Sequence, residues 1–281
     1  METKNKKVAL VTAAIGQKYL DEYNRKYRPS QERFASKIGA PLFVITDFID
    51  KGPKAKTWHP AWQALLIFEI PELREFDYLM WIDGDIYVRE DAQSPIDFIT
   101  YGQPIWMAAK NNAYDLPTLT KTDPNLFKKC PKENRPNTML NLGLFIADRK
   151  TFAPIFRHVY DTAEEQACYY QGPITYEFFN SVPGKVLPPY FNIIIVSYMK
   201  KYGRGLSTVL KCYRENRFIH FAGGVDVFMY YKLCHKLALQ VERNPQSVIS
   251  KMIKFIGQKN FDPATTFVIK VIRKLKRILK V

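Results

Sequence analysis

The chain has 281 residues, 47% of them hydrophobic, and is long enough to bury the core of one α/β domain. It shows no internal repeat and no low-complexity stretch, which excludes the solenoid and disordered classes. Of its net charge of +15, residues 261–281 carry +5, and the other +10 is scattered over the body without a nucleic-acid-binding signature, so no nucleic acid partner is expected.

The first third of the chain predicts a parallel sheet. Residues 8–14 form a short, β-branched apolar run that is typical of a buried strand. A helix is expected over 19–38, with Gly39 as its stop, and a second buried strand over 41–46. Strand, helix and strand in this order make a βαβ unit, so the sheet begins parallel.

A further apolar strand over 78–82 ends in an acidic triplet. A helix is expected over 61–70, ending before Pro71, and leads into this strand. The later elements are expected as strands over 105–109 and 142–147, a helix over 151–167, and a long loop over 111–138 that would cover an acceptor.

The triplet Asp83, Gly84 and Asp85 is the strongest candidate site. Open α/β sheets bind ligands at the carboxyl ends of their strands, which is where these carboxylates lie. Two carboxylates around one residue can hold Mn²⁺ or Mg²⁺, which would bridge the phosphates of a nucleotide. The alternative is a solvated turn in which Gly84 provides the bend.

Five further motifs precede or follow the triplet in a fixed order. They are Pro71-Glu72-Leu73 before the strand, then Asn141-Leu142-Gly143, Thr175-Tyr176-Glu177-Phe178-Phe179-Asn180, Leu187-Pro188-Pro189-Tyr190-Phe191-Asn192, and Ile219-His220-Phe221-Ala222-Gly223. In this order they resemble the GT-A fold glycosyltransferases, with the nearest pattern in family 8 and some likeness to family 34. The resemblance covers roughly residues 8–224 and implies a Rossmann-like, mostly parallel sheet with flanking helices.

The resemblance implies a role for several residues. His220 would be the third metal ligand beside Asp83 and Asp85, and Gly223 would lie at the donor. Asn141 would contact the donor sugar, and Glu177 would face the reacting carbon. The remaining histidines, His59 among them, are interpreted as ordinary residues.

Two groups of residues are expected to hold the rest of the nucleotide. Val11, Thr12 and Ala13, at the end of the first strand, would meet the base and ribose through backbone groups. Lys56 and Lys54 are candidate phosphate partners. The sequence departs from family 8 where Tyr176 replaces the glutamine of its D-Q-D motif and where Gly224-Val225-Asp226-Val227 replaces its K-P-W.

Residues 261–281 form a basic tail with six Lys or Arg against one Asp. Pro263 favours a helix start, and an apolar stripe repeats at helical spacing through Val268, Val271, Ile272, Leu275, Ile278 and Leu279. Such a helix lies at an anionic membrane surface or packs on a protein. The expected division is therefore a GT-A domain over 1–260 and an amphipathic helix over 261–281.

The expected function is transfer of a hexose, with UDP-hexose as donor, to a saccharide or lipid-linked saccharide, with retention of configuration and Mn²⁺ or Mg²⁺ as cofactor. The four cysteines form no C-x-x-C pair, and residues 1–7 are polar, which favours a cytosolic enzyme, peripheral at a membrane. The alternatives are a nucleotidyltransferase and a GT-A-fold protein that binds but does not catalyse.

Overall fold

The computed structural model describes residues 7–99, 105–110, 116–128, 130–164, 169–203 and 206–222, with the single residue 246. The chain divides into two compact units. The first contains the chain up to Ile193 together with Arg217–His220, and the second contains Ile194–Asn216 and the chain from Phe221 onward. The boundary predicted at residue 260 and the basic tail lie outside the described residues.

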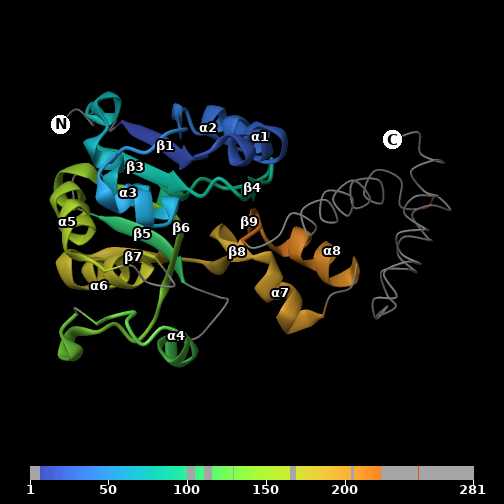
Figure 1. Cartoon of the computed structure of the whole chain (residues 1–281). Coiled ribbons are helices and arrows are strands. Elements are labelled where there is room, and N and C mark those ends of the chain that lie inside the picture. The colour runs from blue at the N-terminus through green and yellow to red at the C-terminus, as the bar shows by residue number, and fades with distance from the viewer. Residues whose placement is uncertain are drawn as a thin grey trace, which may run out of the picture. The chain divides into compact units, whose positions relative to one another are not determined.

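A six-stranded sheet forms the centre of the first unit, in the order β2-β1-β3-β6-β5-β7 (Figure 1). β1 is parallel to β2 and β3, and β7 is parallel to β5, whereas β6 is antiparallel to β3 and β5. Five of the six strands therefore run in one direction, which confirms the mostly parallel α/β sheet. The strands are β1 (Val8–Ala13), β2 (Leu42–Ile45), β3 (Tyr78–Ile82), β5 (Trp106–Lys110), β6 (Leu140–Asp148) and β7 (Gly184–Leu187).

Both faces of this sheet are covered, so its central strands are apolar on both sides. All five residues of β3 and all nine of β6 are buried. One face packs against η1 (Pro60–Glu69), α5 (Arg149–Thr162) and α6 (Gln171–Ser181), with Phe178 stacked among several aromatic rings. The other face packs against α2 (Arg28–Lys37). Phe34 of this helix also packs edge to face with Phe218, with the two ring centroids 5.1 Å apart.

The helix predicted over 19–38 is wrong in one respect, because the segment forms two helices. α1 (Gln17–Lys26) ends at Tyr27, and α2 begins directly after it. Pro29 lies in the first turn of α2 and has no amide hydrogen to continue the α1 pattern, so the helix restarts there. Gly39, at φ +65°, ends α2 as the sequence predicts.

The helix predicted over 61–70 also differs, since η1 consists of 3-10 turns. It lies between Pro60 and Pro71, and every residue from Trp62 to Phe68 is buried. A segment that is apolar on all sides is held by its surroundings, here the sheet and α5. Ile70 is extended, as expected for a residue before proline.

The loop predicted over 111–138 contains two short helices among its described residues. These are α4 (Leu116–Thr122) and η4 (Lys132–Asn134). The other elements of the first unit are α3 (Pro53–Thr57), η2 (Pro71–Leu73), β4 (Ile86–Val88), η3 (Pro95–Phe98), η5 (Pro189–Phe191) and β9 (Phe218–His220).

The second unit contains α7 (Ile195–Tyr202) and α8 (Leu206–Glu215), which pack on each other. The hydroxyl of Tyr198 donates a hydrogen bond to Glu215 across the two helices. β8 (Ile193–Ile194) lies where the chain passes from the first unit to the second. Across the described parts of both units, no helix combines the length and the apolar character needed to cross a membrane.

Candidate metal centre

Asp83 and Asp85 are positioned by the end of β3 and the start of β4. β3 is fully buried up to Ile82, and the Asp83 amide then donates a 2.7 Å hydrogen bond to the Gly143 carbonyl on β6. The Ile86 amide donates back to the Asp83 carbonyl at 3.1 Å, which makes the acidic triplet a tight turn. The turn therefore presents two carboxylates at the carboxyl edge of the parallel strands, as the sequence predicts.

His220 reaches the same place from the far end of the first unit's sequence. It is the last residue of β9, which pairs antiparallel with β4 so that Ile86 lies opposite His220. Its Nε2 atom is 3.1 Å from Asp85 Oδ1 and 3.6 Å from Asp83 Oδ2. One ligand atom from each of the three residues lies within 4.8 Å of the others, so the predicted triad is brought together.

A second set of hydrogen bonds orients these side chains. Trp81 Nε1 donates to Asp83 Oδ1 at 2.7 Å, and His220 Nδ1 lies 3.1 Å from Asn192 Oδ1. Asn192 in turn donates through Nδ2 to the Asn141 carbonyl at 3.1 Å. Such outer partners fix the ring orientation and the tautomer of a ligating histidine.

The Gln31 side chain stabilises the acidic turn by hydrogen bonds to its backbone, a role that the position of Gln31 in the sequence does not reveal. From α2, its Nε2 donates to the carbonyls of Asp83 and Ile86, both at 3.0 Å. Its Oε1 accepts a 3.2 Å hydrogen bond from the Tyr23 hydroxyl. Gln31 is fully buried, so these bonds satisfy backbone groups that water does not reach.

Two glycines allow close packing around the triad. A Cβ atom on Gly84 would lie 2.6 Å from the Ala13 carbonyl oxygen, so the turn packs directly on the end of β1. A Cβ atom on Gly143 would lie 2.7 Å from His220 Cε1 and 2.8 Å from Asp83 Oδ2. Only glycine lets β6 approach the triad this closely.

The electrostatics of the triad favour a bound cation. Burial raises the pKa of Asp83 to about 6; the charge of His220 opposes this rise and that of Asp85 adds to it. Burial by itself lowers the pKa of His220, but the charges of Asp85 and Asp83 outweigh it and leave that pKa raised. Two partly buried carboxylates that crowd a buried imidazole in this way suit a divalent ion such as Mn²⁺ or Mg²⁺.

The residues predicted to hold the nucleotide lie beside the triad. Val11 and Thr12 are fully buried in β1, Ala13 is half-buried, and its carbonyl abuts Gly84. The Thr12 hydroxyl is buried and makes no hydrogen bond with the described residues. Contact with a base or ribose stays a prediction for these three residues.

Asn141 lies in the second layer of the site. Its Oδ1 accepts a 3.1 Å hydrogen bond from the Gly143 amide, while its buried Nδ2 has no partner among the described residues. A buried amide donor without a partner is uncommon in proteins and marks a place where a ligand can accept a hydrogen bond. Its predicted contact with the donor sugar is compatible with this position.

Glu177 lies in a different pocket. With Cys130 and His158 it lines a small cavity of about 90 Å³ beside the end of α5. Burial raises its pKa, and His158 opposes that shift. None of the described contacts of Glu177 involves the triad, so its role at the reacting carbon stays a prediction without geometric support.

The predicted phosphate partners do not reach the triad through any described contact. Lys56 is exposed on α3. Lys54 donates to the Asp161 carbonyl at 2.8 Å, at the end of α5, where a cation complements the helix dipole. Gly223 lies outside the described residues.

Two residues that the sequence analysis missed, Tyr170 and Tyr19, interact electrostatically with the triad. Tyr170 precedes α6 and is fully buried; burial raises its pKa, and the charge of Asp83 raises it further. The next residue, Gln171, has a buried Oε1 atom with no partner in the described structure. Tyr19 on α1 is 45% exposed, and the charges of Asp85 and Asp83 add to the effect of burial in raising its pKa.

Tyr170, which precedes α6, is therefore the residue next to that helix with a described electrostatic link to the triad. The predicted match of the D-Q-D motif to Tyr176 and Glu177 stays a prediction.

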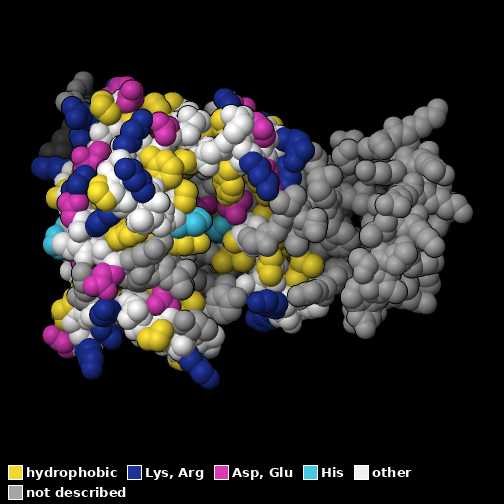
Figure 2. All heavy atoms as spheres, in the orientation of Figure 1, with side chains coloured by type: hydrophobic (Ala, Val, Ile, Leu, Met, Phe, Trp, Pro, Cys, Tyr) yellow, Lys and Arg dark blue, Asp and Glu magenta, His cyan; other side chains and the backbone are white. Residues whose placement is uncertain are grey.

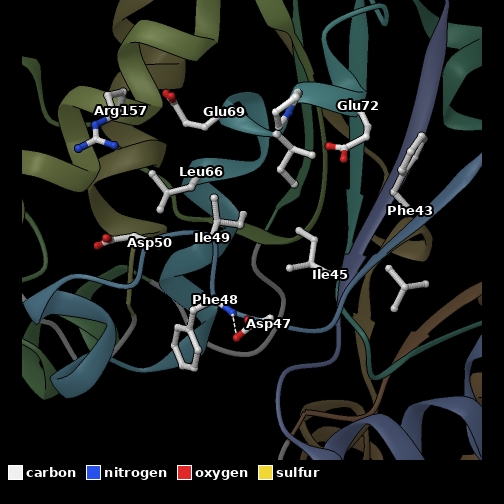
Figure 3. Close-up of a pocket in the computed structure, with 13 residues that line it drawn as sticks. Phe43, Ile45, Asp47, Phe48, Ile49, Asp50, Leu66, Glu69, Glu72 and Arg157 are labelled. Atoms are coloured by element: carbon white, nitrogen blue, oxygen red, sulfur yellow. Dashed lines mark hydrogen bonds between the residues drawn. The ribbon is translucent and has the colours of Figure 1, made fainter.

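Figure 2 shows histidine side chains next to acidic ones near the middle of the described surface, with hydrophobic side chains around them. A separate groove of about 830 Å³ runs along β2, lined by Phe43, Ile45, Leu66 and Ile70 and by the charged residues Asp47, Asp50, Glu69, Glu72 and Arg157 (Figure 3). This groove contains none of the triad.

Comparison with known proteins supports the fold. No protein-family model matches the sequence, and no curated protein matches it. The structure is similar to a glycosyltransferase involved in the glycosylation of the major capsid of PBCV-1, with a TM-score of 0.52 at 15% identity over 82% of this chain and 99% of that one. The apo WbbM bifunctional glycosyltransferase gives a TM-score of 0.47 at 14% identity over 90% and 52% of the two chains. The first likeness shows that the chain has a glycosyltransferase fold of the GT-A-like kind.

Proposed function

We propose that this protein is a metal-dependent glycosyltransferase that moves a hexose from a nucleotide diphosphate sugar, with UDP as the expected nucleotide. One observation carries the proposal: Asp83, Asp85 and His220 converge at the carboxyl edge of the sheet in a glycosyltransferase fold. A structural ion pair would not require two partly buried carboxylates to converge on one buried histidine.

The three side chains of the triad would hold Mn²⁺ or Mg²⁺, which supplies positive charge against the diphosphate of the donor and of the leaving group. Asn192 would keep the His220 Nε2 lone pair turned toward the ion. Tyr19, at the β1 side of the triad, would lie against the nucleotide. The end of β1 would meet the base and ribose through its backbone.

The donor sugar would lie between the triad and the start of α6. There, Asn141 Nδ2 would donate to a sugar hydroxyl oxygen, and Gln171 Oε1 would accept a hydrogen bond from a sugar hydroxyl. Both groups then gain the partner that the protein itself does not give them. The acceptor is expected to be a saccharide or a lipid-linked saccharide.

Retention of configuration follows from the family resemblance. The bond from the anomeric carbon to the diphosphate breaks, the acceptor oxygen forms a bond on the same face, and its proton passes to the departing diphosphate oxygen. An inverting enzyme would instead need a carboxylate to take that proton, for which Glu177 or Asp226 would be the candidates.

The test is hydrolysis of a panel of nucleotide-sugars in Mn²⁺ and in EDTA. We expect hydrolysis of one donor class that requires the ion and falls by several powers of ten in Asp85→Ala. Asp97→Ala removes an exposed carboxylate on η3 and serves as the matched control. Full activity of Asp85→Ala in EDTA would contradict the proposal.

Two other functions would give different results. A protein that only binds would take up UDP in Mn²⁺ but hydrolyse no donor. A nucleotidyltransferase would release pyrophosphate from a nucleoside triphosphate; it usually carries a Gly-rich loop with a basic residue after the first strand, and Ala13-Ala14-Ile15-Gly16 does not provide one.

The basic tail would bring the enzyme to a lipid-linked acceptor at an anionic membrane surface. Each cation near such a surface contributes about 1 kcal/mol, so six cations give an attraction that salt weakens. Co-sedimentation with anionic vesicles should be lost in a chain that ends near Asn260, while donor hydrolysis remains. Equal sedimentation of both chains would assign the tail to the fold.

A further inference from the structure

His59 and Tyr169 form a stacked pair of rings near the triad. Their ring centroids are 4.3 Å apart, and the ring planes differ by 18°. His59 is exposed and Tyr169 is half-buried, so the imidazole is the outer ring and the phenol supports it from within. Neither residue belongs to the triad or to the residues that orient it.

The backbone holds both rings in place. His59 precedes Pro60 and is extended, at φ −60° and ψ 138°, and its Nδ1 accepts a 3.2 Å hydrogen bond from the Ala61 amide. Tyr169 has φ +52° and is the only residue other than glycine with positive φ among the described residues. A tyrosine in this conformation is strained, and such strain is kept where the surrounding structure needs the side chain in one direction.

Tyr170 connects the chain segments that carry this pair to the triad. The Tyr170 hydroxyl donates to the Leu142 carbonyl at 3.5 Å, and Leu142 directly precedes Gly143, which packs against His220 and Asp83. Tyr170 also meets the edge of Trp62 on η1, the element that begins after His59. The residues next to His59 and Tyr169 in sequence therefore pack toward the wall of the metal centre.

We propose that the His59–Tyr169 pair is the platform on which a pyranose ring of the acceptor stacks. This inference rests on the proposed function and names the part of the acceptor that is recognised. A pyranose ring has a face of C–H groups that fits the negative face of an aromatic ring. A histidine whose Nδ1 accepts a backbone hydrogen bond is neutral in this arrangement, so its ring can serve as such a face.

The position favours the acceptor over the nucleotide. Tyr19 follows β1 and lies against Gly84, whereas the stacked pair reaches the triad through β6 and the start of α6. The two aromatic groups thus lie on different approaches to the same carboxylates, one for each substrate.

The test uses saturation-transfer NMR with a panel of methyl hexopyranosides, in the presence of UDP and Mn²⁺. We expect transfer to the protons of one ring face in the wild-type protein. His59→Ala and Tyr169→Ala should weaken glycoside binding by about three- to tenfold, while His59→Phe and Tyr169→Phe retain it. Tyr202→Ala removes an exposed tyrosine ring (44% exposed) in the second unit and is the control.

UDP affinity, Mn²⁺ affinity and thermal unfolding are measured on every variant. If the wild-type protein neither binds UDP in Mn²⁺ nor hydrolyses a donor, the proposed function has failed. If it does, three results overturn this inference alone: no glycoside receives saturation, all variants bind the glycoside equally, or His59→Ala weakens UDP and not the glycoside. The last result would assign the platform to the nucleobase.

Discussion

Asn192 Oδ1 lies 3.1 Å from His220 Nδ1, on the side of the imidazole opposite the two carboxylates. Asn192 is fully buried, and its Nδ2 already donates to the Asn141 carbonyl. Its Oδ1 is therefore the atom that faces His220, and the imidazole must carry its proton on Nδ1. Nε2 is then the nitrogen that faces Asp83 and Asp85, and once deprotonated it supplies the lone pair that a metal ion requires.

Replacing Asn192 should weaken metal binding without removing a ligand. We expect Asn192→Ala to lower Mn²⁺ affinity by about 10- to 100-fold, because the ring loses the partner that fixes its tautomer and orientation. Titration calorimetry with MnCl₂ measures this directly. Asn180→Ala, on the exposed end of α6, is the matched control and should bind Mn²⁺ as the wild type does. Unchanged affinity in Asn192→Ala would show that the hydrogen bond does not orient the ring.

Gly143→Ala should damage the same site through bulk alone. The new Cβ atom would lie 2.7 Å from His220 and 2.8 Å from Asp83, closer than van der Waals contact allows. We expect Mn²⁺ affinity to fall at least tenfold and the free energy of unfolding to fall by about 1–3 kcal/mol. In the control Gly52→Ala, the nearest atom is the end of the flexible Asp50 side chain. A Gly143→Ala protein that binds Mn²⁺ normally would mean that the triad does not hold the ion.

Stability without metal should fall as the pH rises. The pKa of Asp83 is raised from its ordinary value of 3.8 to about 6, so the stability that its protonated form gives is lost as the pH rises between these two values. The raised pKa of His220 acts in the same direction, because the stability from its protonated form is lost as the pH passes that pKa.

Metal binding needs both groups deprotonated, so Mn²⁺ should stabilise the protein more at higher pH. We expect the gain in Tm from MnCl₂ over EDTA to be larger at about pH 8 than at about pH 6. Differential scanning calorimetry at both pH values measures it. In Asp83→Asn, the gain should be small at either pH. A gain in the wild type that is larger at the lower pH would contradict the assignment.

The strain at Tyr169 can be measured by comparing two substitutions. Tyr169→Ala and Tyr169→Gly both remove the ring, but only glycine relieves the positive φ of +52°. We therefore expect Tyr169→Gly to be the more stable of the two by about 1 kcal/mol in urea unfolding. Equal stability would mean that the backbone relaxes to negative φ once the ring is gone.

The sequence predicted the parallel strands and the triad because local patterns encode them. β1 and β3 are continuous apolar runs, and the acidic triplet follows β3 directly. His220 was found through the order of the motifs, and the structure then brings it to the two aspartates.

The features that the sequence did not predict depend on packing between segments that are far apart in the chain. Gln31 supports the acidic turn from α2, a contact between residues far apart in the chain that no local pattern records. Tyr170 was missed because it reaches the Leu142 carbonyl and the charge of Asp83 through packing, which no local pattern records. His59 was interpreted as ordinary because its stacking partner lies far along the chain.

The path of the chain into β9 also sets the order in which the site can be assembled. Both aspartates and the glycines that accommodate them are made early, but the chain passes through the second unit, Ile194–Asn216, before Arg217–His220 returns to the first. A growing polypeptide therefore has two close carboxylates and an unpaired β4 edge until that return. Formation of β9 completes the ligand set and covers the edge in one step, so ion capture would report that the whole first unit has folded.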